Sequence, residues 1–282
     1  MNKFFPRFRD KSRVNKLLGY FTLIFFTLLF AMPFIWIILS SFKSGSELFS
    51  RPPSLWPRNF TLENYTMAFK EVNFLRYFFN SFIVATLATV ITLFINSMAG
   101  YALAKFKFKG SKIIFFSLIF TIMIPLQVIM VPVFIVLRHL NLYDTLWGII
   151  IPPTATPTGV FLIRQYMVTI PNELIESARI DGAGEWRIFW TIIIPLAKPV
   201  LTALMIFSFI WRWNDFIWPF IVISSEKRYT IQIALANFVG QYTVDWNAIL
   251  SMTTLSTIPV FIVFLIFQRH FVKGIAMSGM KM

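Results

Sequence analysis

The stretch from Pro171 to Pro195 reads PNELIESARIDGAGEWRIFWTIIIP, and it is the one long charged insert between two apolar runs. Pro171 suits the first turn of a helix, because the amide that proline lacks would have no acceptor there. Gly182 can adopt the positive φ that ends a first helix, and Asp181 can cap a second one. We expect that second helix to start near Gly184 and to stop or kink at Pro195. The stretch therefore predicts two short helices joined by a turn, lying near a membrane surface.

The composition indicates a membrane protein. Of the 282 residues 57% are hydrophobic, whereas soluble domains have about 45–50%. The chain has no cysteine, which excludes disulfides and thiolate metal sites. It has two histidines, far apart in sequence, so a histidine-based metal site is not expected. The net charge of +14 could indicate a nucleic-acid partner, but in a membrane protein we attribute it to basic cytoplasmic loops, and we expect no nucleic acid.

Six apolar segments predict transmembrane helices. A hydrocarbon core of about 30 Å needs about 20 apolar residues in a helix. The qualifying segments are 17–42, 76–103, 113–137, 146–163, 198–223 and 248–268. The first is too long for the apolar part of a signal peptide and lacks a clear cleavage site, so we expect it to be retained. The fourth contains Pro152, Pro153, Pro157 and Gly159, so we expect a broken helix whose freed backbone groups are satisfied by neighbouring helices or a cavity.

Charge distribution predicts the orientation. With the N-terminus inside, the inner segments carry 17 of the 26 Lys and Arg residues. These segments are 1–16, 104–112, 164–198 and 269–282. By the positive-inside rule both termini are cytoplasmic, as is the stretch 171–195. The outer loop 43–75 is polar and turn-rich with no apolar core, so we do not expect it to form a domain.

The charged stretch also follows a known motif. Its pattern is Glu176-Ser177-Ala178, three residues, Gly182, nine residues, Ile192, one residue, Ile194-Pro195. This resembles the EAA loop of bacterial ABC importer permeases, which reads Glu-Ala-Ala, three residues, Gly, nine residues, Ile, one residue, Leu-Pro. Ser177 and Ile194 are the two departures. The segments 52–65, 213–219 and 271–281 are similar to the sugar-permease branch, so the resemblance covers essentially the whole chain.

The resemblance implies a fold, partners and roles. It implies an all-α permease of the type I ABC importer fold, with six transmembrane helices spanning 17–268, a basic N-terminus 1–16 and a tail 269–282. The chain looks like the second permease subunit of a sugar importer, the maltose-permease MalG type, in a bacterial or archaeal cell membrane. The implied partners are a MalF-like permease, two ATP-binding subunits and a solute-binding protein that delivers the sugar.

The same resemblance implies which residues couple to the ATPase. These are Glu176, Ser177, Ala178, Asp181, Gly182, Ala183 and Pro195. Glu176 would contact the ATPase and Gly182 would form the turn, and neither would be catalytic. ATP and Mg would be used by the partner, and this chain would bind no cofactor and no metal.

The sequence itself also indicates that the energy for transport comes from another subunit or from an ion gradient. The chain lacks a phosphate-binding loop, since Gly110-Ser111-Lys112 is only a superficial match. An ion-coupled secondary transporter is the alternative, but such transporters usually need membrane carboxylates, and Asp215 is the only acid in a predicted span. A membrane enzyme would need convergent acids and histidines, which the sequence lacks. Monosaccharide, oligosaccharide and glycerol-phosphate importers share these motifs, so the solute stays open.

Polar residues within the predicted spans suggest a solute path. Arg212 and Asp215 stand three residues apart, so they can meet on one helix face. With Trp213 and Asn214 they offer the flat aromatic surface and fixed polar groups that suit sugars. The alternative is a structural ion pair beside an interfacial aromatic belt. Weaker candidates for solute contact are Gln127, Thr253 and Thr257. Asn96 could form a hydrogen bond between helices.

Overall fold

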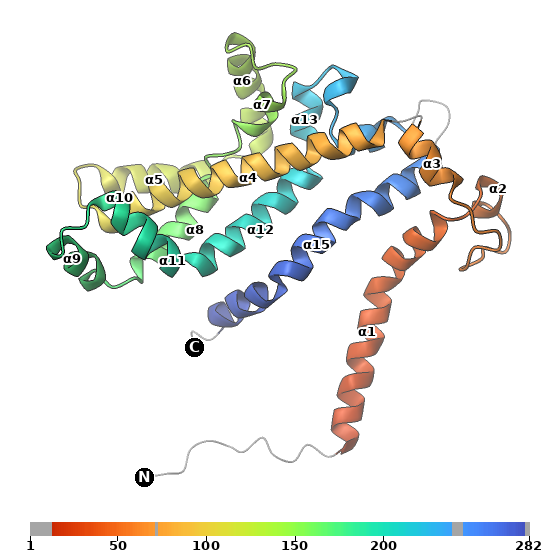
Figure 1. Cartoon of the computed structure of the whole chain (residues 1–282), viewed down its shortest axis with the longest axis horizontal. Helices are drawn as coiled ribbons and strands as arrows, with labels where there is room; N and C mark the ends of the chain where they lie inside the picture. Colours follow the sequence, from red (N-terminus) through yellow and green to blue (C-terminus); the bar gives the residue numbers. More distant parts are fainter. Residues whose placement is uncertain (1–12, 71–72, 239–244, 280–282) are drawn as a thin grey trace. The chain divides into compact units, whose positions relative to one another are not determined.

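The computed structural model describes residues 13–70, 73–238 and 245–279, and these residues form helices and no strands (Figure 1). Most of the predicted basic N-terminus and the last three residues of the predicted tail lie outside the described residues. The described chain divides into two compact units. One comprises the residues up to Ala68 together with Asp245–Leu255, and the other comprises most of the remainder.

The first unit contains a long apolar helix and an ordered polar loop. Helix α1 (Arg13–Ser40) is followed by α2 (Gly45–Leu48) and then by α3 (Glu63–Lys70), which crosses into the second unit. The carboxylate of Glu47 accepts hydrogen bonds from the amides of Arg58 (2.6 Å) and Asn59 (3.3 Å). The ammonium of Lys43 donates to the carbonyl of Ser54 at 2.5 Å. The loop 43–75 therefore has an ordered centre that is polar, which a search for apolar cores does not detect.

The second unit is organised around α4 (Phe74–Lys105), which packs most extensively against α8 (Pro157–Val168) and α12 (Lys198–Asn214). The side-chain amide of Asn96 on α4 donates to Thr156 Oγ1 at 2.7 Å, and the amide of Thr156 donates back to Asn96 Oδ1 at 3.2 Å. The inter-helix hydrogen bond predicted for Asn96 is thus confirmed. It ties α4 to the start of α8.

Shorter helices surround this centre. They are α5 (Ser111–Ile122), α6 (Leu126–His139), α7 (Leu146–Ile150), α9 (Glu173–Ile180), α10 (Glu185–Ile188), the π-helix η1 (Phe189–Ile193), α11 (Ile194–Leu196), α13 (Ile217–Val222), the 3-10 helix η2 (Glu226–Arg228) and α14 (Ile231–Asn237). The last helix, α15 (Trp246–Gly279), belongs partly to each unit. In Figure 1, α9–α11 lie at one end of α4 and α13 lies toward the other.

Three helices are long and apolar enough to cross a membrane: Leu18–Ser40, Phe74–Lys105 and Trp246–Gln268. Two bent pairs also qualify if each is one span. In these pairs Ser111–Ile122 meets Leu126–His139 at 107°, and Glu185–Leu196 meets Lys198–Asn214 at 78°. The described residues therefore contain three to five candidate spans. The count of six spans and the side of each terminus stay predictions.

The predicted spans differ from the observed helices in three places. The segment 113–137 is not one helix, because Pro125 disfavours helical backbone in the residue before it and lacks an amide donor. The segment 198–223 is divided, because the backbone of Asp215 is extended (φ −71°, ψ 122°) and α13 starts anew at Ile217. The segment 146–163 holds α7, a turn and part of α8, which confirms that it is not a straight helix.

Candidate coupling element and membrane cavity

The stretch 171–195, named here the two-helix element, forms the predicted pair of helices. Helix α9 ends at Asp181, and Gly182 follows with the expected positive φ of 82°. Helix α10 begins after Gly184, whose backbone is extended (φ −70°, ψ 160°). The prediction that Asp181 caps α10 is wrong, because Asp181 ends α9 and three residues separate it from the first residue of α10.

The second helix of the element continues further than predicted. It passes through the π-helix η1 into α11, and Pro195 lies inside α11 rather than at a kink. The 78° bend falls between Leu196 and Lys198. Ala197 there is the N-cap of α12, with Pro199 in the first turn, and proline is favoured in that position. The bend thus marks the start of a new helix, and the prediction of a kink at Pro195 is wrong by two residues.

The two-helix element is apolar on its inner face. Ile175 from α9 and Ile188 and Phe189 from the second helix are buried in a cluster with Tyr101 of α4 and Met167 of α8. This side packs the element against the rest of the unit. A helix that buries one apolar face leaves its opposite face to solvent or to a partner.

The outer face carries most of the residues singled out by the motif. Glu176, Ser177, Asp181, Gly182 and Pro195 are exposed. Ala178 is buried and Ala183 is half-buried, so these two residues pack the element.

Four large apolar side chains are also exposed on this element: Leu174, Ile180, Trp186 and Trp190. Ile180 is 87% exposed and Trp186 is 60% exposed. Exposed apolar side chains gathered beside polar ones are typical of a surface that binds another protein.

Polar contacts that sequence analysis missed tie the element to α4. Glu185 accepts a hydrogen bond from Tyr101 Oη at 3.0 Å and pairs with Arg179 Nε at 2.7 Å. Lys105 Nζ donates to the carbonyl of Ile170 at 2.5 Å and to Asn172 Oδ1 at 2.9 Å. The guanidinium of Arg179 lowers the pKa of Glu185 below its usual value. No local motif predicts the contacts to α4, because Tyr101 and Lys105 lie more than 60 residues from their partners in sequence, whereas Arg179 and Glu185 are six residues apart.

A second feature is a cavity of about 360 Å³ bordered by α6, the end of α12, α13 and the turn after α7. Its lining includes Met130, Pro153, Trp211, Arg212, Asp215 and Trp218. It is largely apolar with two charged side chains, which is the usual character of a small-molecule site.

Arg212 and Asp215 line this cavity without forming an ion pair. Arg212 Nη2 donates to Thr92 Oγ1 at 3.3 Å and to the carbonyl of Pro153, while its buried Nε has no hydrogen-bond partner. Asp215 accepts from the amide of Trp218 at 3.4 Å. The predicted meeting on one helix face is wrong, because α12 ends at Asn214 and Asp215 has left the helix.

The other predicted path residues lie elsewhere. Trp213 is 1% exposed and donates its indole N–H to the carbonyl of Ser256 at 2.9 Å, so it does not line the cavity. Asn214 is exposed and donates to the carbonyl of Ile210 at 2.9 Å. Gln127 is exposed near the start of α6, and Thr253 and Thr257 are half-buried one turn apart on α15. Of the predicted set, the cavity gathers Arg212 and Asp215.

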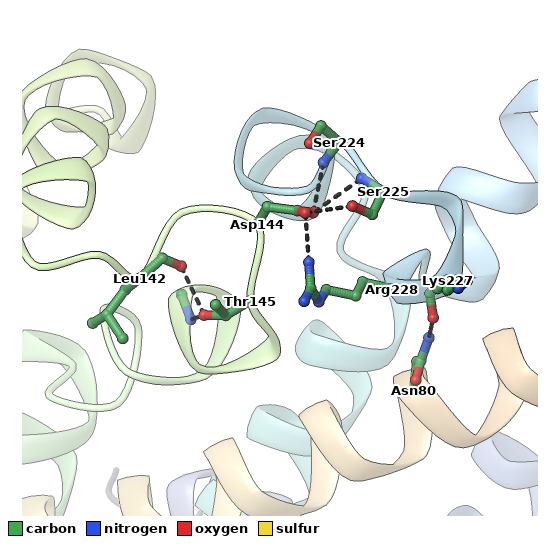
Figure 2. A network of polar contacts seen from close by, with 9 residues as sticks. Asn80, Leu142, Asp144, Thr145, Ser224, Ser225, Lys227 and Arg228 are labelled. Carbon is green, nitrogen blue, oxygen red and sulfur yellow. Dashed lines mark hydrogen bonds and ion pairs between the residues drawn. The ribbon is translucent and has the colours of Figure 1, made fainter.

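A third feature is a polar network around Asp144, shown in Figure 2. Its carboxylate accepts from the amides of Ser224 (3.1 Å) and Ser225 (2.9 Å), from the Ser225 hydroxyl and from Arg228 Nη1 (2.5 Å). Burial alone would raise the pKa of Asp144, but these hydrogen bonds outweigh it and the pKa is lowered. On the other side of this loop, Asn80 of α4 donates to the carbonyl of Lys227 at 3.1 Å.

Metal chemistry finds no support in the described residues. Across 13–70, 73–238 and 245–279, no group of three or more His, Cys, Asp or Glu side chains is placed to hold a metal ion.

Comparison with known proteins identifies the family. A model described as "Binding-protein-dependent transport system inner membrane component" matches residues 96–277. The arabinooligosaccharides transport system permease protein AraQ of Bacillus subtilis (strain 168) is 37% identical over 258 residues, which is 90% of this chain and 92% of that protein. The sn-glycerol-3-phosphate transport system permease protein UgpE of Brucella abortus (strain 2308) is 33% identical over 275 residues, covering 94% and 98%.

A solved structure agrees with this assignment. A chain in the crystal structure of a bacterial ABC transporter involved in the import of the acidic polysaccharide alginate superposes with a TM-score of 0.82. It is 26% identical, and the match covers 93% of this chain and 99% of that one. The chain therefore belongs to the family of binding-protein-dependent transport system inner membrane components, and it is a membrane permease of an ABC importer rather than an enzyme.

Proposed function

We propose that this chain forms half of the translocation pathway for a sugar or short oligosaccharide. It pairs with a homologous MalF-like permease, and two ATP-binding subunits hydrolyse ATP with Mg. A solute-binding protein delivers the solute, as the family description "binding-protein-dependent" indicates. The name of the relative AraQ, which refers to arabinooligosaccharides, favours an oligosaccharide.

The single observation that supports coupling is the form of the two-helix element. Its inner face is buried against α4 and α8, whereas Glu176, Ile180 and Trp186 are exposed on its surface. We assign this exposed face to the ATPase, with Gly182 as the turn and Glu176 as the contact residue. Ser177, Ala178, Asp181, Ala183 and Pro195 shape the same element.

This assignment requires a particular topology. The two-helix element must face the cytoplasm, where the ATPase and its nucleotide are found. Six spans within 17–268, with residues 1–16 and 269–282 both on the cytoplasmic side, meet that requirement. The three long helices and the bent pair at 107° then give four spans, and the segments 146–163 and 198–223 supply the other two, so that α10 and α11 stay outside the membrane with the rest of the element.

We also propose that the cavity beside α12 belongs to the solute path. Trp211 and Trp218 offer flat apolar faces to a sugar ring, while Arg212 and Asp215 offer a donor and an acceptor. The buried, unpartnered Nε of Arg212 is a donor available to a solute hydroxyl. Trp213 is not included, because it is buried on another side of α12.

The coupling proposal is tested with the reconstituted importer in proteoliposomes. We expect Glu176→Ala to lower ATP-dependent uptake and ATPase binding by about tenfold, as loss of one central interface contact often does. Glu173→Ala is the matched control, because Glu173 is exposed on the same helix outside the motif. Equal behaviour of the two variants would contradict the assignment. Uptake abolished by an ionophore while ATP is maintained would instead support an ion-coupled transporter.

The path proposal is tested by Asp215→Asn, with uptake and complex yield measured together. We expect uptake to fall while the yield of folded complex is retained. Loss of complex yield would show that Asp215 is structural.

A glycerol phosphate solute is the second candidate. The identity of 33% to UgpE and the buried guanidinium in the cavity favour it. Competition between labelled arabinooligosaccharide and glycerol 3-phosphate for uptake distinguishes the two solutes. Inhibition by glycerol 3-phosphate alone would replace the sugar assignment.

A further inference from the structure

A single carboxylate joins three helices at one end of α4. Glu185, in the first turn of α10, accepts from Arg179 of α9 through Oε1 and from Tyr101 of α4 through Oε2. The distances are 2.7 Å and 3.0 Å, so both oxygens are engaged. The Arg179 guanidinium also lies 6.0 Å from the centre of the Phe106 ring, just after α4.

These polar contacts are not needed to build the fold. Arg179 and Glu185 are 43% and 44% exposed, and exposed ion pairs contribute little to folding stability. The buried cluster of Ile175, Ile188 and Phe189 already attaches the element to its neighbours. The contacts must therefore be explained by something other than cohesion of the core.

The polar contacts of Glu185 lie across the turn between α9 and α10. Gly182 has a positive φ, and neither Gly182 nor Gly184 has a neighbouring atom where a Cβ would lie. The two glycines therefore add no side-chain packing to the turn, which is closed by backbone hydrogen bonds from the amide of Gly182 to the carbonyl of Arg179 (3.0 Å) and from the amide of Ala183 to the carbonyl of Ala178 (2.9 Å). The bridge from Arg179 to Glu185 spans the turn directly, and Tyr101 fixes the bridge to α4.

We propose that Tyr101, Arg179 and Glu185 form a coupling clasp, which makes the two-helix element and α4 move as one body. Force applied to the element then reaches α4 without being lost in the turn. This inference rests on the proposed function, because it takes the element to be the part that the ATPase moves. The three residues are positioning residues and touch neither ATP nor solute.

Helix α4 connects the clasp to the cavity. Thr92 lies nine residues before Tyr101 on α4, about 14 Å along the helix at 1.5 Å per residue. Thr92 Oγ1 accepts the hydrogen bond from Arg212 Nη2, which lines the cavity on α12. A displacement of α4 relative to α12 would therefore change the hydrogen bonding of Arg212. Breaking the clasp should uncouple ATP hydrolysis from solute movement.

Charge exchange tests the clasp in the complete importer. The variants are Arg179→Glu, Glu185→Arg and the double exchange, which restores the ion pair with reversed polarity. The Tyr101 hydroxyl can accept a hydrogen bond from an arginine at position 185 as well as donate one. Tyr101→Phe removes the third contact alone. Tyr166→Phe is its matched control, because Tyr166 packs against the same buried cluster outside the clasp.

The decisive measurement is ATP hydrolysed per solute imported, with complex yield as the check on folding. We expect each single exchange to keep the complex and its hydrolysis and to lower uptake about fivefold or more, within the usual range of coupling between sites. The double exchange should return the ratio close to that of the wild type, and Tyr166→Phe should leave it unchanged.

Three results would overturn the clasp: an unchanged ratio in the single exchanges, a loss of uptake that tracks a loss of complex, or a double exchange no better than the singles. Failure of the proposed function gives a different result, because the wild-type complex itself would then show no ATP-dependent uptake.

Discussion

A carboxylate organises the loop contacts near each end of α4, and the two carboxylates are used differently. Asp144 is 17% exposed and accepts from two amides, a hydroxyl and a guanidinium. Glu185 is 44% exposed and accepts from one guanidinium and one phenol. At the Asp144 end, Tyr77 and Asn80 of α4 also bond the segment 226–229, with Tyr77 Oη donating to Glu226 Oε1 at 2.7 Å.

The difference separates an attachment that stabilises the fold from one that positions an element. A carboxylate whose acceptor sites are filled by backbone amides and a cation is costly to release, because the amides would lose their partner. A half-exposed ion pair contributes little to folding stability. The Asp144 end thus stabilises its loop, whereas the Glu185 end adds little stability and, in the proposed clasp, positions the two-helix element against α4.

The largest expected effect comes from removing Asp144. Asp144→Ala leaves the amides of Ser224 and Ser225 without their acceptor. This should lower the free energy of unfolding by about 2–3 kcal/mol. For a chain of this size that lowers the Tm by roughly 5–10 °C. Tryptophan fluorescence during heating of the purified complex measures it. A Tm unchanged from the wild type would show that the two ends do not differ.

A smaller loss is expected at the contact between α4 and α8. A Cβ at Gly159 would collide with the side chains of Asn96 and Thr156. Gly159→Ala should therefore lower the free energy of unfolding by about 2 kcal/mol, because the added methyl group overpacks this contact. Gly19→Ala is the control, because no atom lies near a Cβ at that position. If Gly159→Ala melts like Gly19→Ala, α4 and α8 are not a rigid pair and the comparison of the two ends of α4 loses its basis.

A still smaller loss of folding stability is expected from a substitution at the turn of the two-helix element. Gly182→Ala places a residue with a Cβ at a φ of 82°, which should cost about 1 kcal/mol. Gly184→Ala has a φ of −70° and open space, so it should be nearly neutral. The Tm difference between these two variants checks the prediction. A greater loss for Gly184→Ala would contradict it.

The smallest effect is expected in the pH dependence. The pKa values of both Asp144 and Glu185 are lowered in the folded chain, from ordinary values of 3.8 and 4.5. Such a group contributes stability that is present above its unfolded pKa and is lost as the pH falls through the folded one.

The difference in Tm between wild type and Asp144→Asn should therefore shrink as the pH falls below about 4. The curve of Glu185→Gln should stay close to the wild type at every pH, because exposure weakens its interactions. A Glu185→Gln curve that diverges as strongly as that of Asp144→Asn would show that the two ends are equivalent.

Local patterns predicted local structure well. The positive φ of Gly182 followed from the Asp-Gly sequence, and the broken helix at 146–163 followed from its prolines. The hydrogen bond of Asn96 followed from a polar side chain in an apolar run. For Gly182 and 146–163 the cause lies within a few residues of the feature, whereas for Asn96 the sequence predicted the bond but not its partner Thr156, which is 60 residues away.

The features missed by sequence depend on distant partners or on backbone detail. The separation of Arg212 from Asp215 follows from an extended residue that ends α12, and a pattern of three-residue spacing cannot show it. Tyr101 and Glu185 are 84 residues apart, so neither marks the other in the sequence. The polar centre around Glu47 uses backbone amides, which every residue type provides.

The π-helix Phe189–Ile193 determines how many residues fit between the turn of the two-helix element and Pro195. A π turn accommodates one additional residue within an otherwise α-helical run. Deleting one residue there would allow the run to become regular, and each later side chain would then rotate by about 100° around the axis. Relatives of this importer that are one residue shorter between the turn and Pro195 should therefore hold the exposed face that carries Trp186 at a different angle to α12.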